Sequence, residues 1–228
     1  MKSLIEKIAV CVERGKVNAK SIFPPDLKGE DGADELTYQA INSGVSPNEV
    51  LNKGLIEGMR RIGEKFRQNK AFVPDVLIAA KAMNSAMVHI QPFFLSNEIK
   101  TKGKVVIGTV SGDLHDIGKN ILGMIIRGGG WEVIDLGVDV SPEKFVKAIE
   151  NENPDAVCMS ALLTTTMLNM EKIISEIKKT YAKLPVLVGG APLTQVYADS
   201  INADFYSSDP QRALDYLNNF IKKGLSSD

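Results

Sequence analysis

Cysteine and histidine are both scarce in this sequence, which has two of each among its 228 residues. Cys11 and Cys158 lie in separate apolar segments and form no CxxC pair, which argues against a disulfide framework and against a thiolate zinc site. The N-terminal segment interrupts its apolar residues with Glu6, Lys7 and Glu13, whereas a signal peptide needs an unbroken apolar core of about 7–15 residues. We therefore expect a cytoplasmic protein.

An excess of charge of one sign is also missing. Lys and Arg number 27 against 28 Asp and Glu, which leaves a formal net charge of −1. A protein that binds nucleic acid or an anionic membrane shows a basic excess, so neither partner is expected. No apolar run approaches the roughly 20 residues of a membrane span. With 44% hydrophobic and 24% charged residues, the composition is that of a globular protein.

Helical periodicity alone marks the first part of the chain, residues 1–97. Ser46–Glu49 combines an N-cap residue, a first-turn proline and a glutamate, and it predicts one helix running on to Phe66. Further helices are predicted near residues 4–12, 33–42 and 74–94, and the segment 15–32 is an expected extended connector. We expect an all-α helical bundle.

A different pattern begins after a short charged linker, residues 98–103. Short apolar runs rich in β-branched residues predict strands at 105–110, 132–137, 156–161, 185–190 and 204–208. Amphipathic stretches at 117–126, 142–150, 168–181 and 210–223 separate or follow them. This alternation predicts a flavodoxin-like (Rossmann-like) α/β domain over residues 104–228, with a five-stranded parallel sheet.

Small and polar residues follow three of these predicted strands. The segments are Ser111–Asn120, Ser160–Thr166 and Gly189–Pro192. Because ligands on parallel sheets bind outside the carboxyl ends of the strands, we expect one binding site at this edge.

Three chemistries compete for that site. A phosphate cradle is disfavoured because both glycine-rich phosphate motifs are missing and Asp113 and Asp116 would repel an anion. A receiver-type phosphoacceptor Asp113 would need a further acidic pair and a lysine at a later strand end, and neither is found. The third is metal ligation by His115, oriented by Asp113, with Ser160 and Thr166 both candidates to support that carboxylate. No second ligand is near in the sequence, so the metal must bring its own, as in a macrocycle.

These motifs resemble the signature of cobalamin-binding domains of the methionine-synthase type. The signature is D-x-H-x-x-G at Asp113–Gly118, S-x-L at Ser160–Leu162 and G-G at Gly189-Gly190. The helical half is similar to the cap module of the same family over Gly58–Pro74. The likeness is strongest to the corrinoid proteins of methyltransferase systems, and it extends over nearly the whole chain.

The resemblance implies roles for particular residues. His115 matches the axial cobalt ligand that replaces the cofactor's own tail base, and Asp113 matches its hydrogen-bonding partner. Thr166 stands where methionine synthase has a serine in the same relay. Tail-pocket contacts match Ser160, Thr164, Gly189 and Gly190, and contacts to the methyl-bearing face match Phe66 and Val73. Further cofactor-binding positions implied in this way are Met59, Gly112, Leu114, Asp116, Ile117, Gly118, Leu162, Ala191 and Tyr206.

The resemblance also implies a function. The cofactor would be cobalamin or a related cobamide that alternates between cob(I)alamin and methylcobalamin. The chain would carry a methyl group from a substrate-specific methyltransferase to an acceptor methyltransferase, for delivery to a tetrahydrofolate or a thiol, and would be non-catalytic alone. A reductive activase for Co(II) is a third expected partner.

Two other classes use the same cofactor domain. Cobalamin photoreceptors or regulators usually carry an added DNA-binding domain, for which this chain has no residues left over. Small subunits of adenosylcobalamin mutases lack the helical cap. Both are weaker alternatives to the methyl carrier.

Overall fold

The computed structural model describes residues 3–96 and 98–224, and it divides into two compact units. The first, the helical unit, comprises Met1–Thr101 with Gly128–Gly130. The second, the α/β unit, comprises Lys102–Arg127 and Trp131–Asp228. Among the described residues, no helix combines the length and the apolar character that crossing a membrane requires.

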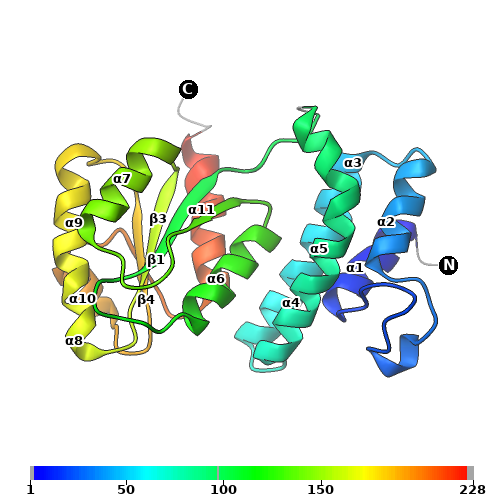
Figure 1. Cartoon of the computed structure of the whole chain (residues 1–228), viewed down its shortest axis with the longest axis horizontal. Helices are drawn as coiled ribbons and strands as arrows, with labels where there is room; N and C mark the ends of the chain where they lie inside the picture. The colour runs from blue at the N-terminus through cyan, green and yellow to red at the C-terminus, as the bar shows by residue number, and fades with distance from the viewer. Residues whose placement is uncertain (1–2, 97, 225–228) are drawn as a thin grey trace. The chain divides into compact units, whose positions relative to one another are not determined.

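Helices and short turns build the helical unit (Figure 1). Its buried side chains include Ile8, Val12, Leu55, Val76 and Ile90. The α-helices are α1 (Leu4–Glu13), α2 (Ala33–Asn42), α3 (Pro47–Glu49), α4 (Glu57–Arg67) and α5 (Val73–Leu95), with a 3-10 turn η1 (Pro25–Leu27) and a π-helical segment η2 (Val50–Ile56).

The single helix expected from Ser46 to Phe66 is interrupted. Its first turn α3 passes into the π-helical η2, and regular α-helix resumes only at Glu57. A π-helical segment has i→i+5 hydrogen bonds, and the apolar periodicity of a sequence does not reveal it. The expected extended connector also differs in part, because η1 forms within it and Lys16 is fully buried, its Nζ donating to Ser21 O at 2.9 Å.

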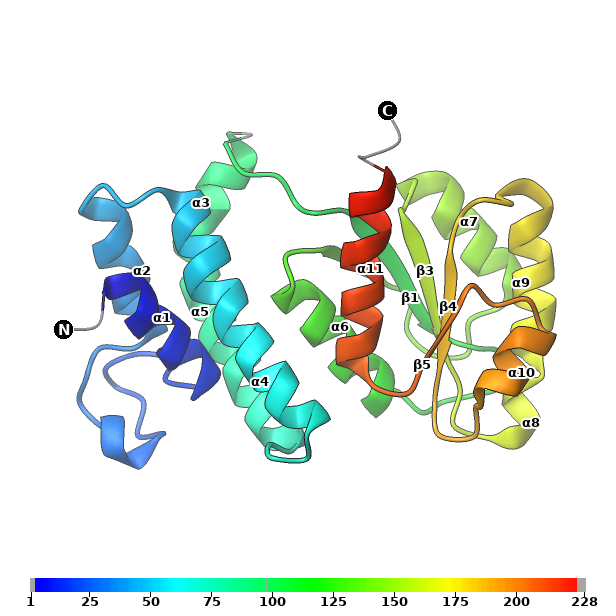
Figure 2. The ribbon, with the colours of Figure 1, turned by 180° about the vertical axis from the view of Figure 1, so that it is seen from behind.

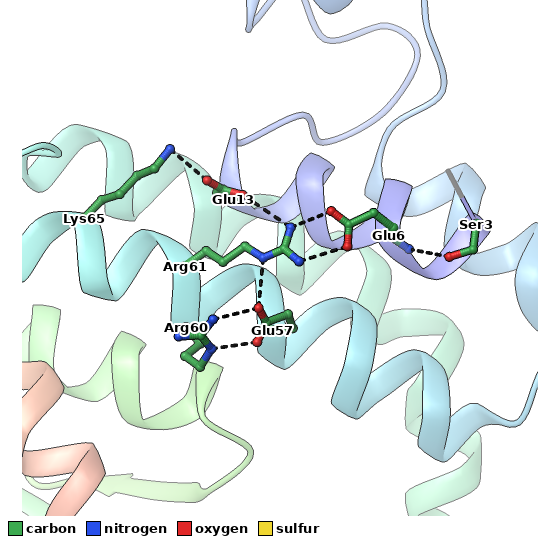
Figure 3. A network of polar contacts seen from close by, with 7 residues as sticks. All are labelled: Ser3, Glu6, Glu13, Glu57, Arg60, Arg61 and Lys65. Carbon is green, nitrogen blue, oxygen red and sulfur yellow. Dashed lines mark hydrogen bonds and ion pairs between the residues drawn. The ribbon is translucent and has the colours of Figure 1, made fainter. Parts of the chain in front are cut away.

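Arg61 of α4 joins α4 to α1 (Figure 3). Its guanidinium donates to both carboxylate oxygens of Glu6 at 2.8 and 2.9 Å, and its Nε donates to Glu57 at 2.9 Å. Glu13 lies 3.7 Å away and also pairs with Lys65. The pKa of Glu57 falls to about 2, chiefly through its hydrogen bond from Arg60, with burial opposing and Arg61 adding to the effect.

Replacing Arg61 with alanine should lower the free energy of unfolding by about 1–2 kcal/mol, because bidentate contacts in a network are worth more than an isolated surface pair. Urea unfolding followed by far-UV circular dichroism measures the loss. Lys53→Ala is the control: its pair with Glu49 lies within one helical stretch and is largely exposed, so about 0.5 kcal/mol or less is expected. Equal losses in the two variants would show that the network adds nothing.

The α/β unit contains a five-stranded parallel sheet in the order β2-β1-β3-β4-β5. This order is the flavodoxin-like one, so the expected fold of a helical region followed by such a sheet is confirmed. The strands are β1 (Lys104–Thr109), β2 (Glu132–Asp135), β3 (Ala156–Ser160), β4 (Val186–Gly189) and β5 (Phe205–Ser207). The helices are α6 (Ile117–Gly128), α7 (Pro142–Glu152), α8 (Thr164–Met167), α9 (Asn169–Thr180), α10 (Gln195–Ser200) and α11 (Pro210–Gly224).

Helices cover both faces of this sheet (Figures 1 and 2). On the face of α7, α9 and α10, a core cluster includes Phe145, Val157, Met159, Ile173 and Val188. Helices α6 and α11 lie on the other face. Since the chain reverses its winding direction between β1 and β3, a crevice is expected where these two strands end.

Candidate functional site

The loop between β1 and α6 is fixed by side chains from elsewhere in the α/β unit. The Asp139 carboxylate accepts from Gly112 N–H at 2.7 Å, and Asp139 N–H donates to Asp113 O at 3.0 Å. The amide of Asn169 donates to Ser111 O at 2.7 Å. Gly112 has φ +79°, a value that favours glycine. The loop therefore has one defined conformation in which its central side chain, Asp113, points inward.

Asp113 is the hub of the site, and its side chain is fully buried. One carboxylate oxygen accepts from Leu162 N–H at 2.8 Å and from the hydroxyl of Thr166 at 2.5 Å. The other accepts from the backbone N–H of His115 at 3.0 Å and lies 2.8 Å from His115 Nδ1. Burial acts to raise the pKa of Asp113, but hydrogen bonds from Thr166, Leu162 and His115 outweigh it and hold that pKa well below its usual range. Asp113 is therefore a carboxylate at neutral pH.

His115 is half exposed at the carboxyl edge of the sheet, with 51% of its side chain accessible. Because an ionised Asp113 only accepts hydrogen bonds, the proton of a neutral imidazole lies on Nδ1. The lone pair of Nε2 then remains for another partner. This arrangement of carboxylate, imidazole and outward nitrogen is the one found in histidines that bind metals.

The two candidates to support Asp113 take different positions. Thr166 donates to Asp113, whereas Ser160 lies 3.0 Å from the hydroxyl of Thr109. Thr109 is fully buried and donates to His115 O at 3.0 Å, so its single proton is used there and Ser160 is the donor between the two hydroxyls. Thr109 thus anchors the backbone of His115 to the end of β1, a role that sequence reasoning missed.

Thr109→Val should lower the free energy of unfolding by about 1–3 kcal/mol, because the change leaves His115 O and the Ser160 hydroxyl without a buried partner. Thr109→Ser restores the hydroxyl and should recover most of the loss. Urea unfolding of the α/β unit, followed by the fluorescence of its buried Trp131, compares the three proteins. A valine variant as stable as the serine variant would contradict this anchoring role.

A pocket of about 410 Å³ opens between α6, α11 and the ends of β3, β4 and β5. Lys119 lies at its wall and is 3% exposed, with its Nζ 2.6 and 2.7 Å from the two carboxylate oxygens of Asp135. Lys119 was not among the expected site residues. The expected residues that line this pocket are Gly118, Ser160, Gly189, Gly190, Ala191 and Tyr206.

The remaining residues expected to bind the cofactor do not line this pocket. Exposed side chains in the loops after β1 and β3 belong to Leu114, Asp116 and Leu162, and those of Ile117 and Thr164 are exposed at the first residues of α6 and α8. In the helical unit, Met59 is 2% exposed, whereas Phe66 and Val73 are partly exposed. Phe72, which belongs to the cap resemblance but has no assigned role, is 67% exposed at the start of α5.

Close contacts with the backbone explain why glycines stand at the end of β4, at positions 189 and 190. A Cβ on Gly190 would lie 1.9 Å from Ala161 O, and Gly190 has φ +136°. A Cβ on Gly189 would lie 3.0 Å from Ser207 O. The close approach of the Ala161 backbone therefore requires glycine at position 190, whether or not a ligand binds there.

Comparisons with known proteins show the family of this chain. Two family models, both described as B12 binding domains, match residues 103–214 and 29–91. The trimethylamine corrinoid protein of Methanosarcina barkeri is 41% identical over 186 residues, which are 80% of this chain and 86% of that one. The dimethylamine corrinoid protein of the same organism is 38% identical over 173 residues, 75% of this chain and 81% of that one.

A solved structure is similar over both units. A chain of the methanol:cobalamin methyltransferase complex MtaBC from Methanosarcina barkeri superimposes with a TM-score of 0.80 at 28% identity, covering 96% of this chain and 80% of that one. The sheet, its carboxylate-held histidine and the pocket all lie within one matched B12 binding model, and the second model matches the helical unit, so the chain is a cobalamin-binding protein. The chain belongs to the corrinoid proteins of methyltransferase systems: it is a methyl-carrying protein whose cofactor is a cobalamin or a related corrinoid.

Proposed function

We propose that this chain binds its corrinoid with His115 Nε2 as the axial ligand of cobalt and with the cofactor's own base displaced. The observation that carries this proposal is the half-exposed imidazole whose Nδ1 is held 2.8 Å from a fully buried carboxylate. A corrin ring already supplies the equatorial ligands of its metal, so one outward nitrogen is what the protein needs to provide. The residues therefore fit the group.

The displaced tail is proposed to enter the pocket of about 410 Å³ beside His115. Pockets of about 300–1,000 Å³ hold ligands of this size class. Gly118 and Gly189 line the pocket without side chains, and Ser160 lines it on the β3 side. The tail would thus anchor the cofactor in the α/β unit while leaving the edge around His115 to the ring.

The bound corrinoid supplies a cobalt centre that accepts a methyl group as a nucleophile and later gives it up. The chain's own part is to control the proton and the position of His115. With Nε2 on the metal, Asp113 would accept a hydrogen bond from Nδ1–H and so strengthen the ligand. With Nε2 free of the metal, Asp113 would still hold the ring through Nδ1. Thr166 and Leu162 keep that carboxylate in place throughout.

We further propose three partners: a substrate-specific methyltransferase, an acceptor methyltransferase that delivers the methyl group to a tetrahydrofolate or a thiol, and a reductive activase. The names of the relatives support methylamines as the donors to test first, with methanol next. The match of residues 29–91 to a B12 binding model supports a part in corrinoid binding for the helical unit, including Met59, Phe66 and Val73.

The test is methyl transfer with the whole chain. The protein is reconstituted with cobalamin, reduced, and mixed with a methyltransferase specific for trimethylamine, dimethylamine or methanol and its substrate. Visible absorption then follows the change of the cobalt state. Methylation with one enzyme and donor, and its loss when either is omitted, is expected. A holoprotein that stays unmethylated with every pair, although free cobalamin is methylated under the same conditions, would contradict the carrier function.

A further inference from the structure

The pocket beside His115 has an apolar floor, which follows from strand register. Cys158 of β3 pairs with Leu187 of β4. Ser160 pairs with Gly189 two residues further along the strands, nearer the carboxyl edge of the sheet. Their neighbours Val157, Met159 and Val188 belong to the core cluster on the opposite face, so Cys158 and Leu187 face α6 and α11. Leu122 of α6 and Ala213 of α11 close this end of the pocket.

Polar side chains that line the pocket are already engaged. The ammonium group of Lys119 has three acceptors, the two oxygens of Asp135 and Asn120 Oδ1, for its three protons. Ser160 donates to Thr109, and the hydroxyl of Tyr206 donates to Leu193 O at 3.0 Å.

The remaining polar side chains of the pocket either donate their proton within the protein or lie at its rim. Ser207 Oγ donates to Asp209 O at 2.5 Å. Burial raises the pKa of the Cys158 thiol to about 12, so the floor carries no charge there at neutral pH. Ser208 is exposed, and it lies with Asp209 directly before the helix α11, so these two residues make a polar rim. Among the described lining residues away from the rim, the hydroxyl and ammonium protons are therefore already donated, so few side-chain donors remain for the ring nitrogens of a ligand.

We propose that this floor selects the lower base of the cobamide: it accepts an apolar aromatic base, of the benzimidazole or phenol type, and discriminates against purines. The inference rests on the proposed placement of the tail in this pocket. A purine buries several ring nitrogens and an amino group, and each that loses water without gaining a partner weakens binding. A phenolic ring has no such groups to satisfy, and a displaced benzimidazole has one, the ring nitrogen that no longer binds cobalt. Gly118, Cys158, Gly189 and Ala213 leave room for its flat faces.

The experiment measures the dissociation constants of four corrinoids for the whole wild-type chain by equilibrium dialysis with visible absorption. The ligands are p-cresolylcobamide, adeninylcobamide, cobalamin and cobinamide. The first two form the deciding pair. A phenolic base never binds cobalt and adenine binds it weakly, so the free energy of detaching the base from cobalt contributes little to the difference between their dissociation constants. Cobinamide has no tail and reports on the ring and the histidine alone.

We expect p-cresolylcobamide to bind at least about tenfold more tightly than adeninylcobamide, the effect of one or more unpaired buried polar groups. Equal binding of these two, both well above cobinamide, would overturn the base selectivity and leave the tail pocket standing. Equal binding of all four would overturn the tail placement itself, and the inference with it.

A variant locates the effect. Cys158→Ser puts a hydroxyl in place of the thiol with little change of volume, so adeninylcobamide should gain relative to p-cresolylcobamide and the ratio should fall by about threefold or more. Cys11→Ser makes the same change at the other buried cysteine, which lies in α1 of the helical unit, and should leave the ratio unchanged. A ratio that is high in wild type and identical in Cys158→Ser would place the base away from this floor and overturn the inference.

Discussion

Replacing Gly190 with alanine should lower the free energy of unfolding by about 3 kcal/mol or more. The new Cβ would lie 1.9 Å from Ala161 O, a backbone atom that cannot move without shifting the loop after β3. Gly190 also has φ +136°, a conformation that side chains rarely adopt. The loop after β3 carries Leu162, whose N–H holds Asp113, so the damage should reach the histidine as well.

Gly118→Ala is the matched control for this change. A Cβ on Gly118 would meet no atom within 4 Å, and the residue lies in the first turn of α6, so the fold should tolerate it. Gly118 nevertheless lines the pocket, and its variant should bind tail-bearing cobamides less tightly than wild type does. Thermal and urea unfolding together with corrinoid dialysis compare the two variants. A Gly190→Ala protein as stable as Gly118→Ala would contradict the close backbone approach.

Removal of His115, the proposed axial ligand, should have the largest effect on the cofactor. His115→Ala is expected to weaken binding of an oxidised corrinoid by about 100-fold or more, since even loss of the groups that orient a metal ligand costs about 10–100-fold. Asp113→Asn keeps the ligand and should fall within that smaller range. Equilibrium dialysis of each apoprotein against the same corrinoid gives the comparison.

The chain offers a clean control for this prediction, because it has only one other histidine. His89 lies in α5 of the helical unit, and its Nε2 is 2.6 Å from Asp34 Oδ1. His89→Ala should leave corrinoid binding within about twofold of wild type. A His115→Ala protein that binds as tightly as His89→Ala would remove His115 from the cobalt.

Much of the site could be predicted because its parts are local in the sequence. Asp113 and His115 are two residues apart in one loop, and their contact needs no distant element to be recognised. Strand and helix alternation placed this loop at the edge of a parallel sheet. The family resemblance then pointed to Thr166 as the support for Asp113, and the structure brings these two together at 2.5 Å.

The remainder depends on contacts between distant segments. Thr109 and Asp139 hold the loop from β1 and from the segment after β2, and nothing in the periodicity of either segment marks such a bond. Lys119 reads as an ordinary helix cation until Asp135 of the neighbouring strand is placed beside it. The resemblance assigns Gly190 to the tail pocket, whereas the approach of Ala161 O from another loop already requires glycine there.

Electron paramagnetic resonance of the Co(II) holoprotein tests the central proposal, that His115 replaces the cofactor's own base on cobalt. The protein is prepared once with natural histidine and once with histidine labelled with nitrogen-15, and each is loaded with the same unlabelled cobalamin. If the axial nitrogen is His115 Nε2, the triplet splitting of the cobalt lines changes to a doublet in the labelled protein. The His115→Ala protein should show neither pattern from a histidine, and His89→Ala should behave as wild type. A triplet that persists unchanged in the labelled protein would show that the axial nitrogen belongs to the cofactor, and would contradict the account.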